Sequence, residues 1–163
     1  MKRLQPYWPE LLLIGGGLLL RLVFALLPFD LLLRLLEDDA WMVTAIARNF
    51  AIGNGITADS VNPTNGFHPL YPLTLGALPY LALPAHSIEQ LQAGFRLNLL
   101  ICALLNTLAL LPLYGLLRHV ARRPIALAGL ALLALNPFLV RVSVNAMEPR
   151  WRCYCCCCCG GPL

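Results

Sequence analysis

Three consecutive carboxylates, Glu37, Asp38 and Asp39, stand between apolar runs in a 163-residue chain of which only 12% is charged. A carboxylate partly withdrawn from water can act as a general base, or it can hold a divalent cation such as Mg²⁺ or Mn²⁺. An aspartate at a helix start can equally do no more than cap the helix, by accepting backbone N–H groups of the first turn. A cap accounts for one aspartate and leaves the other, so both interpretations stand.

Four further residues carry groups that such a site would use. Glu148 is an isolated acid in "NAME", and His68 lies in "FHPLYP". Arg96 and Arg141 are predicted at helix ends, where a guanidinium can bind phosphate through paired hydrogen bonds. Arginines at helix ends also extend to lipid headgroups without binding a substrate, and this interpretation stays open for both.

The elements that would position these residues are apolar. The chain is 59% hydrophobic, which lies outside the range of soluble globular proteins. Three runs, residues 11–28, 97–117 and 124–141, approach the roughly 20 residues of a transmembrane helix. A fourth run, 69–84, contains four prolines and cannot form one unbroken helix, so we expect an interfacial or re-entrant segment there. The predicted fold class is an all-α integral membrane protein.

Basic residues indicate the orientation of these helices. The cluster "RHVARR" at 118–123 and the N-terminal "MKR" are assigned to the cytoplasm by the positive-inside tendency. The first run is then an uncleaved signal anchor that leads outward, and residues 29–96 form an outer loop. The helix from residue 124 leads outward again, so Glu148 is predicted on the same side as the acidic triplet. The net charge of +4 therefore reflects orientation and gives no indication of nucleic-acid binding.

An amphipathic helix is predicted to follow the acidic triplet along the membrane surface. Its apolar face is predicted at helical spacing and is interrupted only by Asn49. The predicted face consists of Trp41, Met42, Ala45, Ile46 and Phe50. Gly53 and the following Asn-Gly pair should end the helix.

Within the first run, Arg21 should face a protein neighbour or a wet cavity, because it lies in mid-span. "GGG" at 15–17 is a weak signal for helix packing and is no phosphate loop, since no strand precedes it.

The C-terminal stretch 149–163 has unusual composition, with six of the seven cysteines. Tyrosine codons are TAY and cysteine codons TGY, so a shift of reading frame turns residues 153–159 into six leucine codons. We therefore expect a frameshifted tail in place of a transmembrane helix, and expect residues 1–148 to be the N-terminal part of a longer protein. The alternative is a genuine cysteine-rich tail that binds a soft metal or carries palmitate.

The stretch 37–78, "EDDAWMVTAIARNFAIGNGITADSVNPTNGFHPLYPLTLGAL", resembles the first outer loop of membrane glycosyltransferases of the GT-C superfamily. This group includes the protein O-mannosyltransferases and the aminoarabinose transferases of lipid A. Four features carry the resemblance: an acidic pair opening a surface helix, "ARN...GNGIT", "TNGFHPLYP" before a proline-broken run, and the acid of "NAME". Their order and spacing match across about residues 10 to 148.

The resemblance implies an inverting transfer of a sugar from a polyprenyl-phosphate donor to an acceptor lipid, glycan or protein, at the outer face of a bacterial inner membrane. It implies that Asp38 or Asp39 is the acid/base, with Asp38 favoured. It also implies that His68 lines the cavity, and that Glu148 places the acceptor or a cation. Asp38 and Glu148 are then the candidate metal ligands.

Other classes of protein stay open. A transporter or scaffold fragment would also contain broken apolar helices, although a transporter should place its ionisable residues at mid-bilayer. The chain could also be an inactive truncated protein.

Overall fold

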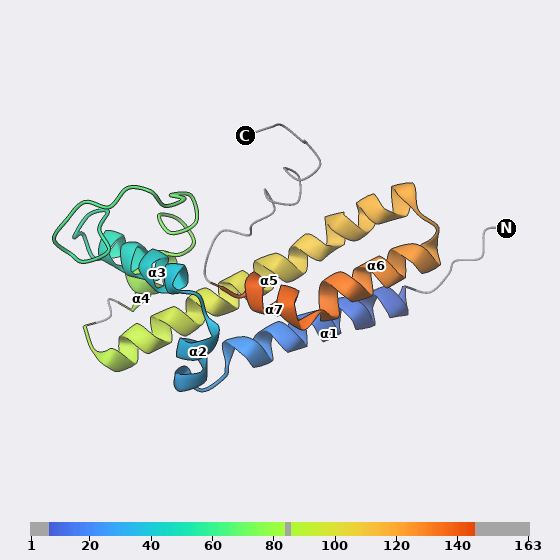
Figure 1. The fold of residues 1–163 in the computed structure, drawn as a ribbon, viewed down its shortest axis with the longest axis horizontal. Helices are drawn as coiled ribbons and strands as arrows, with labels where there is room; N and C mark the ends of the chain where they lie inside the picture. The colour runs from blue at the N-terminus through green and yellow to red at the C-terminus, as the bar shows by residue number, and fades with distance from the viewer. Residues whose placement is uncertain (1–6, 84–85, 146–163) are drawn as a thin grey trace.

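The apolar runs form a bundle of long helices in the computed structural model, which describes residues 7–83 and 86–145 (Figure 1). The bundle consists of α1 (Trp8–Ala25), α5 (Ile88–Val120), α6 (Arg123–Leu135) and α7 (Pro137–Ser143). Within the described residues the ordered elements are all helices, apart from one isolated bridge between Thr57 and Pro63. The all-α prediction is therefore confirmed for this part of the chain.

In the part of the chain that the structure describes, two helices, α1 and α5, are long and apolar enough to cross a membrane. The bent pair of α6 and α7 counts as a third span if it is one unit. The prediction placed a single helix over residues 124–141, whereas the structure bends it by 59° between α6 and α7. Pro137 causes the break because it has no N–H to continue the helix. Asn136 reinforces it, since its side-chain oxygen accepts from the N–H groups of Phe138 and Leu139.

The second span begins earlier than the sequence indicated. Ser87 caps α5 by accepting from the N–H of Gln90 at 3.2 Å, so the helix starts at Ile88 and not near residue 97. It continues through Pro112 to Val120 over 33 residues. At 1.5 Å per residue this is about 50 Å, longer than the roughly 30 Å hydrocarbon core.

An ion pair fastens one end of the bundle. Arg123 donates from Nε to Glu10 Oε1 at 2.9 Å and from Nη2 to Glu10 Oε2 at 3.0 Å. The hydroxyl of Tyr114 donates to the same Glu10 at 2.7 Å. These contacts join the start of α1, the last turns of α5 and the start of α6. Sequence reasoning did not anticipate this use of Glu10.

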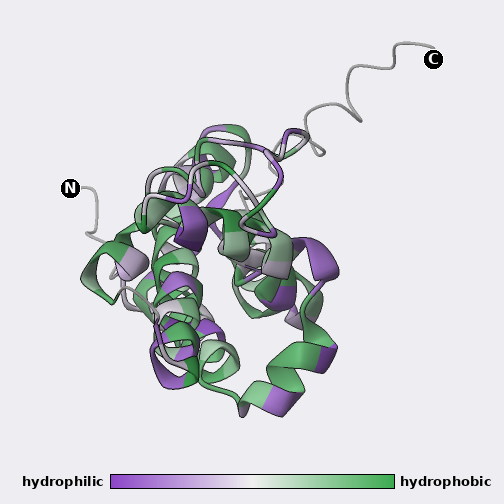
Figure 2. Ribbon diagram, turned by 90° about the vertical axis from the view of Figure 1, so that its left-hand side faces the viewer, coloured by the Kyte–Doolittle hydropathy of each residue, from purple (hydrophilic) through white to green (hydrophobic). Residues whose placement is uncertain are grey.

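The outward surface of the bundle is apolar. Exposed leucines project from α1, α5 and α6, among them Leu12, Leu19, Leu108, Leu116 and Leu132. Figure 2 shows apolar colour over most of the long helices. Helices that are apolar on their outward as well as their inward sides suit a lipid environment, which is consistent with a membrane protein.

A smaller unit lies at the other end of the bundle from the ion pair (Figure 1). It contains α2 (Phe29–Leu35), α3 (Asp38–Ala51) and α4 (Leu78–Ala82). As predicted, the proline-rich run is not one helix, because turns over residues 70–77 precede the short α4. A core cluster joins this unit to α1, α5 and the end of α7. The cluster consists of Ala25, Leu32, Leu36, Ala40, Phe95, Leu99, Ala103 and Val144.

Candidate functional site

Asp38 and Asp39 occupy the first turn of α3, and both are exposed. The cap position belongs to Glu37, which has extended backbone and forms no side-chain cap bond. The interpretation that Asp38 or Asp39 caps this helix is therefore wrong, because both lie inside the helix and not at its cap position. Both aspartates still lie where the partial positive charge of the helix N-terminus stabilises an anion.

The residue that precedes them joins α3 to the end of α7. Asn145 Nδ2 donates to Glu37 Oε2 at 3.3 Å, and the backbone N–H of Glu37 lies 3.5 Å from Asn145 Oδ1. Asn145 is only 7% exposed. It opens the "NAME" motif, whose acid Glu148 lies outside the described residues. Glu37 therefore meets the first residue of the "NAME" motif, although the two residues are 108 positions apart in the chain.

Aromatic stacking fixes the start of α3 on the long helix below it. The ring of Trp41 stacks on Phe95 of α5 at a centroid distance of 4.3 Å and an interplanar angle of 13°. Phe29 of α2 meets both rings edge-on, at 5.6 Å from Trp41 and 5.9 Å from Phe95. Aromatic rings pack in preferred relative orientations. These contacts with α2 and α5 therefore fix the direction of the first turn of α3.

The face of α3 that packs against protein coincides only in part with the apolar face predicted to lie along the membrane surface. Ile46 is buried, but Met42 and Phe50 are 36% and 41% exposed. The buried positions are Ala40, Val43, Thr44, Ile46, Ala47 and Asn49. Ala47 and Ala51 pack against the buried ring of Tyr80 in α4. At these two positions the close approach of α4 leaves room only for small side chains.

Asn49 organises the loop that follows α3. Its Nδ2 donates to the carbonyl of Thr57 at 2.9 Å, and its Oδ1 accepts from the hydroxyl of Ser60 at 2.9 Å. Its side chain is 2% exposed, so these bonds are shielded from water. Sequence reasoning noted Asn49 only as an interruption of an apolar face. A polar residue at such a position was the signal that it binds a neighbouring segment.

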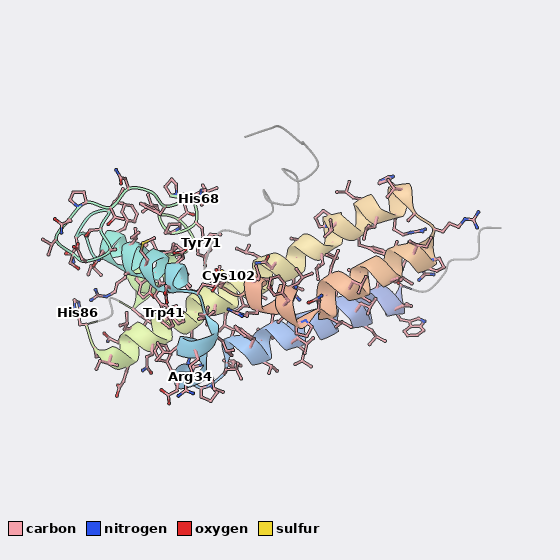
Figure 3. All side chains as sticks on the ribbon, viewed as in Figure 1. Arg34, Trp41, His68, Tyr71, His86 and Cys102 are labelled. Atoms are coloured by element: carbon pink, nitrogen blue, oxygen red, sulfur yellow. The ribbon has the colours of Figure 1, made fainter. Side chains whose placement is uncertain are left out.

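Asp59 closes a tight turn in the same loop. Its Oδ1 accepts from the N–H of Asn62 at 2.8 Å and from that of Val61 at 2.9 Å. These two hydrogen bonds hold the pKa of the Asp59 carboxyl well below its usual range. Asp59 therefore stays ionised at neutral pH as a structural acceptor. The loop leads on to His68, which is exposed (Figure 3).

We expect Asn49→Ala to release this loop. The substitution removes the side-chain bonds to Thr57 and Ser60 and leaves the Thr57 carbonyl without this donor, a loss of about 1–3 kcal/mol. Limited proteolysis should cut between residues 52 and 68 several-fold faster, whereas the exposed control Asn65→Ala should be cut at the rate of the unaltered protein. Equal rates in all three proteins would contradict the role of Asn49.

A buried polar network attaches the segment after His68 to α5. The hydroxyl of Tyr71 donates to Asn98 Oδ1 at 3.0 Å, and the thiol of Cys102 donates to the Tyr71 oxygen at 3.0 Å (Figure 3). Asn98 Nδ2 donates to the Gly76 carbonyl at 3.0 Å. Burial raises the pKa of Tyr71 above its ordinary value and raises that of Tyr80 to about 12. Both phenols stay neutral at pH 7, so their role here is structural.

The two arginines proposed for phosphate binding differ in their surroundings. Arg96 donates from Nη1 to the carbonyl of Ala25 at 3.3 Å, at the C-terminal end of α1. This contact stabilises the end of that helix, a role that neither sequence interpretation included. Arg141 lies in the last turn of α7 and is exposed. Of the two, Arg141 is the more accessible to an anion.

The metal prediction concerns Asp38 and Glu148. Among residues 7–83 and 86–145, no group of three or more His, Cys, Asp or Glu side chains could hold a metal ion. Glu148 and the tail 149–163 lie outside the described residues, so the metal pairing and the frameshift both remain predictions.

Comparison with known proteins gives no relative for this chain. No family model matches it, and no curated protein or solved structure matches it.

Proposed function

We propose that the protein is the N-terminal part of a GT-C-like membrane glycosyltransferase. It would transfer a sugar from a polyprenyl-phosphate donor to an acceptor hydroxyl at the outer face of a bacterial inner membrane. The N-terminus and the basic cluster at 118–123 would then lie in the cytoplasm.

The contact between Glu37 and Asn145 carries this proposal. A shared reaction centre requires that the acidic first turn of α3 and Glu148 lie together. The hydrogen bond between Asn145 Nδ2 and Glu37 Oε2 supports this, because it joins the residue before that turn to the first residue of "NAME". The basic turn after α5 lies at the opposite end of the bundle (Figure 1). Both observations agree with a site on the non-cytoplasmic side.

The proposed reaction uses one of the two exposed aspartates as the general base. Asp38 or Asp39 takes the proton of the acceptor hydroxyl. At the same time the acceptor oxygen forms a bond to the anomeric carbon of the sugar. The bond from that carbon to the phosphate oxygen breaks, and polyprenyl phosphate leaves. Positioning and charge stabilisation supply most of the acceleration in such a step.

The other candidate residues would bind substrate in this scheme. Arg141 would hold the donor phosphate, with Arg96 beside the end of α1 as a second cation. His68 would contact the sugar or acceptor, and Glu148 would place the acceptor. If Asp39 is the base, Asp38 and Glu148 would be free to hold a Mg²⁺ or Mn²⁺ ion that offsets the charge of the phosphate.

A transfer assay in sealed vesicles tests the proposal. The 163-residue chain and a longer form, continued in the shifted frame after Glu148, are each reconstituted with a polyprenyl-phosphate donor that carries a labelled sugar. We expect the longer form to transfer label when donor and acceptor are on the side of the α3 unit, and protein-free vesicles to transfer none. If both forms remain inactive over a panel of donor sugars and acceptors, the proposal is overturned.

A further inference from the structure

Arg21 of α1 is buried against the point where α6 ends and the third span bends. Arg21 is 2% exposed. Its Nη1 donates to the carbonyl of Gly17 at 2.9 Å and to that of Ala134 at 3.0 Å. Its Nη2 makes a longer contact of 3.5 Å with the carbonyl of Leu133. The sequence predicted a protein neighbour or a wet cavity for Arg21, and the structure provides a protein neighbour.

The two carbonyls of α6 lack their usual backbone donors. The carbonyl of Leu133 would be paired with the N–H of residue 137, but this residue is a proline. The carbonyl of Ala134 would be paired with Phe138, whose N–H instead donates to the side chain of Asn136 at 2.9 Å. An unpaired carbonyl is strongly disfavoured within a membrane, because no water is present to replace the missing donor.

Local packing lets the guanidinium reach these carbonyls. A Cβ atom at Gly17 would lie 3.0 Å from both the Cβ and the carbonyl oxygen of Ala134, and 3.2 Å from Arg21 Nη1. Only a glycine therefore allows this approach of α1 to α6. The C-terminal end of α6 also carries partial negative charge, which favours a cation there.

We propose that Arg21 is a positioning residue for the site. By donating to the carbonyls that the break exposes, it holds the span in its bent form. The bend directs α7 so that Asn145 meets Glu37. Without Arg21, the carbonyl of Ala134 would favour pairing with the N–H of Phe138, as in a continued α6, and this would carry residue 145 away from α3. The link to catalysis rests on the proposed function, but the geometric role can be tested without it.

Disulfide formation between Glu37→Cys and Asn145→Cys reports the bend. Cys153 and Cys155–Cys159 are first replaced by serine, and the protein is oxidised in membranes. We expect efficient cross-linking with Arg21 present, at least fivefold less in Arg21→Met, and partial retention in Arg21→Lys, which keeps a charged donor. Arg34→Met is the matched control, because Arg34 is exposed on α2, and it should cross-link normally. Normal cross-linking in Arg21→Met, or an equal loss in Arg34→Met, would overturn the proposal.

Pro137→Ala separates this role from a general contribution to folding. Alanine restores an N–H that can pair with Leu133, so Arg21 should matter less. We expect the fall in thermal midpoint caused by Arg21→Met to shrink by at least half in the Pro137→Ala background. An undiminished fall would show that Arg21 acts elsewhere. Neither measurement involves sugar transfer, so an inactive protein with this cross-linking pattern would reject the proposed function alone.

Discussion

Replacing Asp38 by asparagine is expected to lower the rate of sugar transfer at least about 100-fold, since a positioned general base contributes roughly 10² to 10⁴. Asparagine keeps the size of the side chain and removes its ability to take a proton. Asp39→Asn should lower the rate less than about tenfold if Asp38 is the base. Initial rates at saturating donor, measured for each variant in the vesicle assay, give this comparison.

The matched control is Asp30→Asn. Asp30 is also an exposed acid in the first turn of a helix, here α2, so its loss changes the same charge on the same unit. It should leave transfer within about twofold, as expected for an exposed surface charge. If the double variant Asp38→Asn/Asp39→Asn transfers sugar at the normal rate, neither aspartate is the base.

Gly94→Ala is expected to destabilise the contact between α4 and α5 by about 1–3 kcal/mol, the usual range for overpacking. A Cβ atom at this position would lie 2.4 Å from Tyr80 Cε1 and 2.8 Å from Cδ1. The tyrosine ring is 1% exposed, so it cannot move aside without disturbing Ala47 of α3. Thermal unfolding in detergent, followed by circular dichroism, should show a midpoint several degrees lower.

Gly115→Ala is the natural comparison on the same helix. Nothing lies within 4 Å of a Cβ atom there, so alanine should raise stability slightly, by about 0.5–1 kcal/mol through its better helix propensity. If Gly94→Ala lowers the thermal midpoint and Gly115→Ala raises it, the loss at Gly94 is assigned to the contact with the Tyr80 ring. A stabilising Gly94→Ala would show that the close approach of α4 is not maintained in solution.

Local signals in the sequence predicted the local structure well. The acidic triplet and the Gly53 stop bracket α3, which ends at Ala51, and Gly53 adopts a φ of +85°. Four prolines excluded one helix over residues 69–84, and the turns confirm this. Such features depend on the conformational limits of single residues, so they can be inferred from the chain alone.

Features that depend on distant neighbours were not predictable in this way. Composition could not show that Glu37 pairs with Asn145, because hydrogen bonding across 108 positions is decided by how the helices pack. The side of α3 that packs against protein could not be located from hydropathy, because hydropathy does not report how closely α4 approaches. Arg21 was recognised as needing a partner, but its acceptors become available only through the break at Pro137.

The uninterrupted course of α5 also sets the distance between the basic cluster and the acidic turn. From Arg118, in the basic cluster, to Phe95, beneath Trp41, the helix rises about 35 Å at 1.5 Å per residue. This is close to the roughly 30 Å thickness of the lipid tails. If Arg118 lies at the headgroups of the inner leaflet, the carboxylates of α3 would lie at the level of the headgroups of the outer leaflet. A phosphate anchored there by its polyprenyl chain would then reach them without being drawn out of its leaflet.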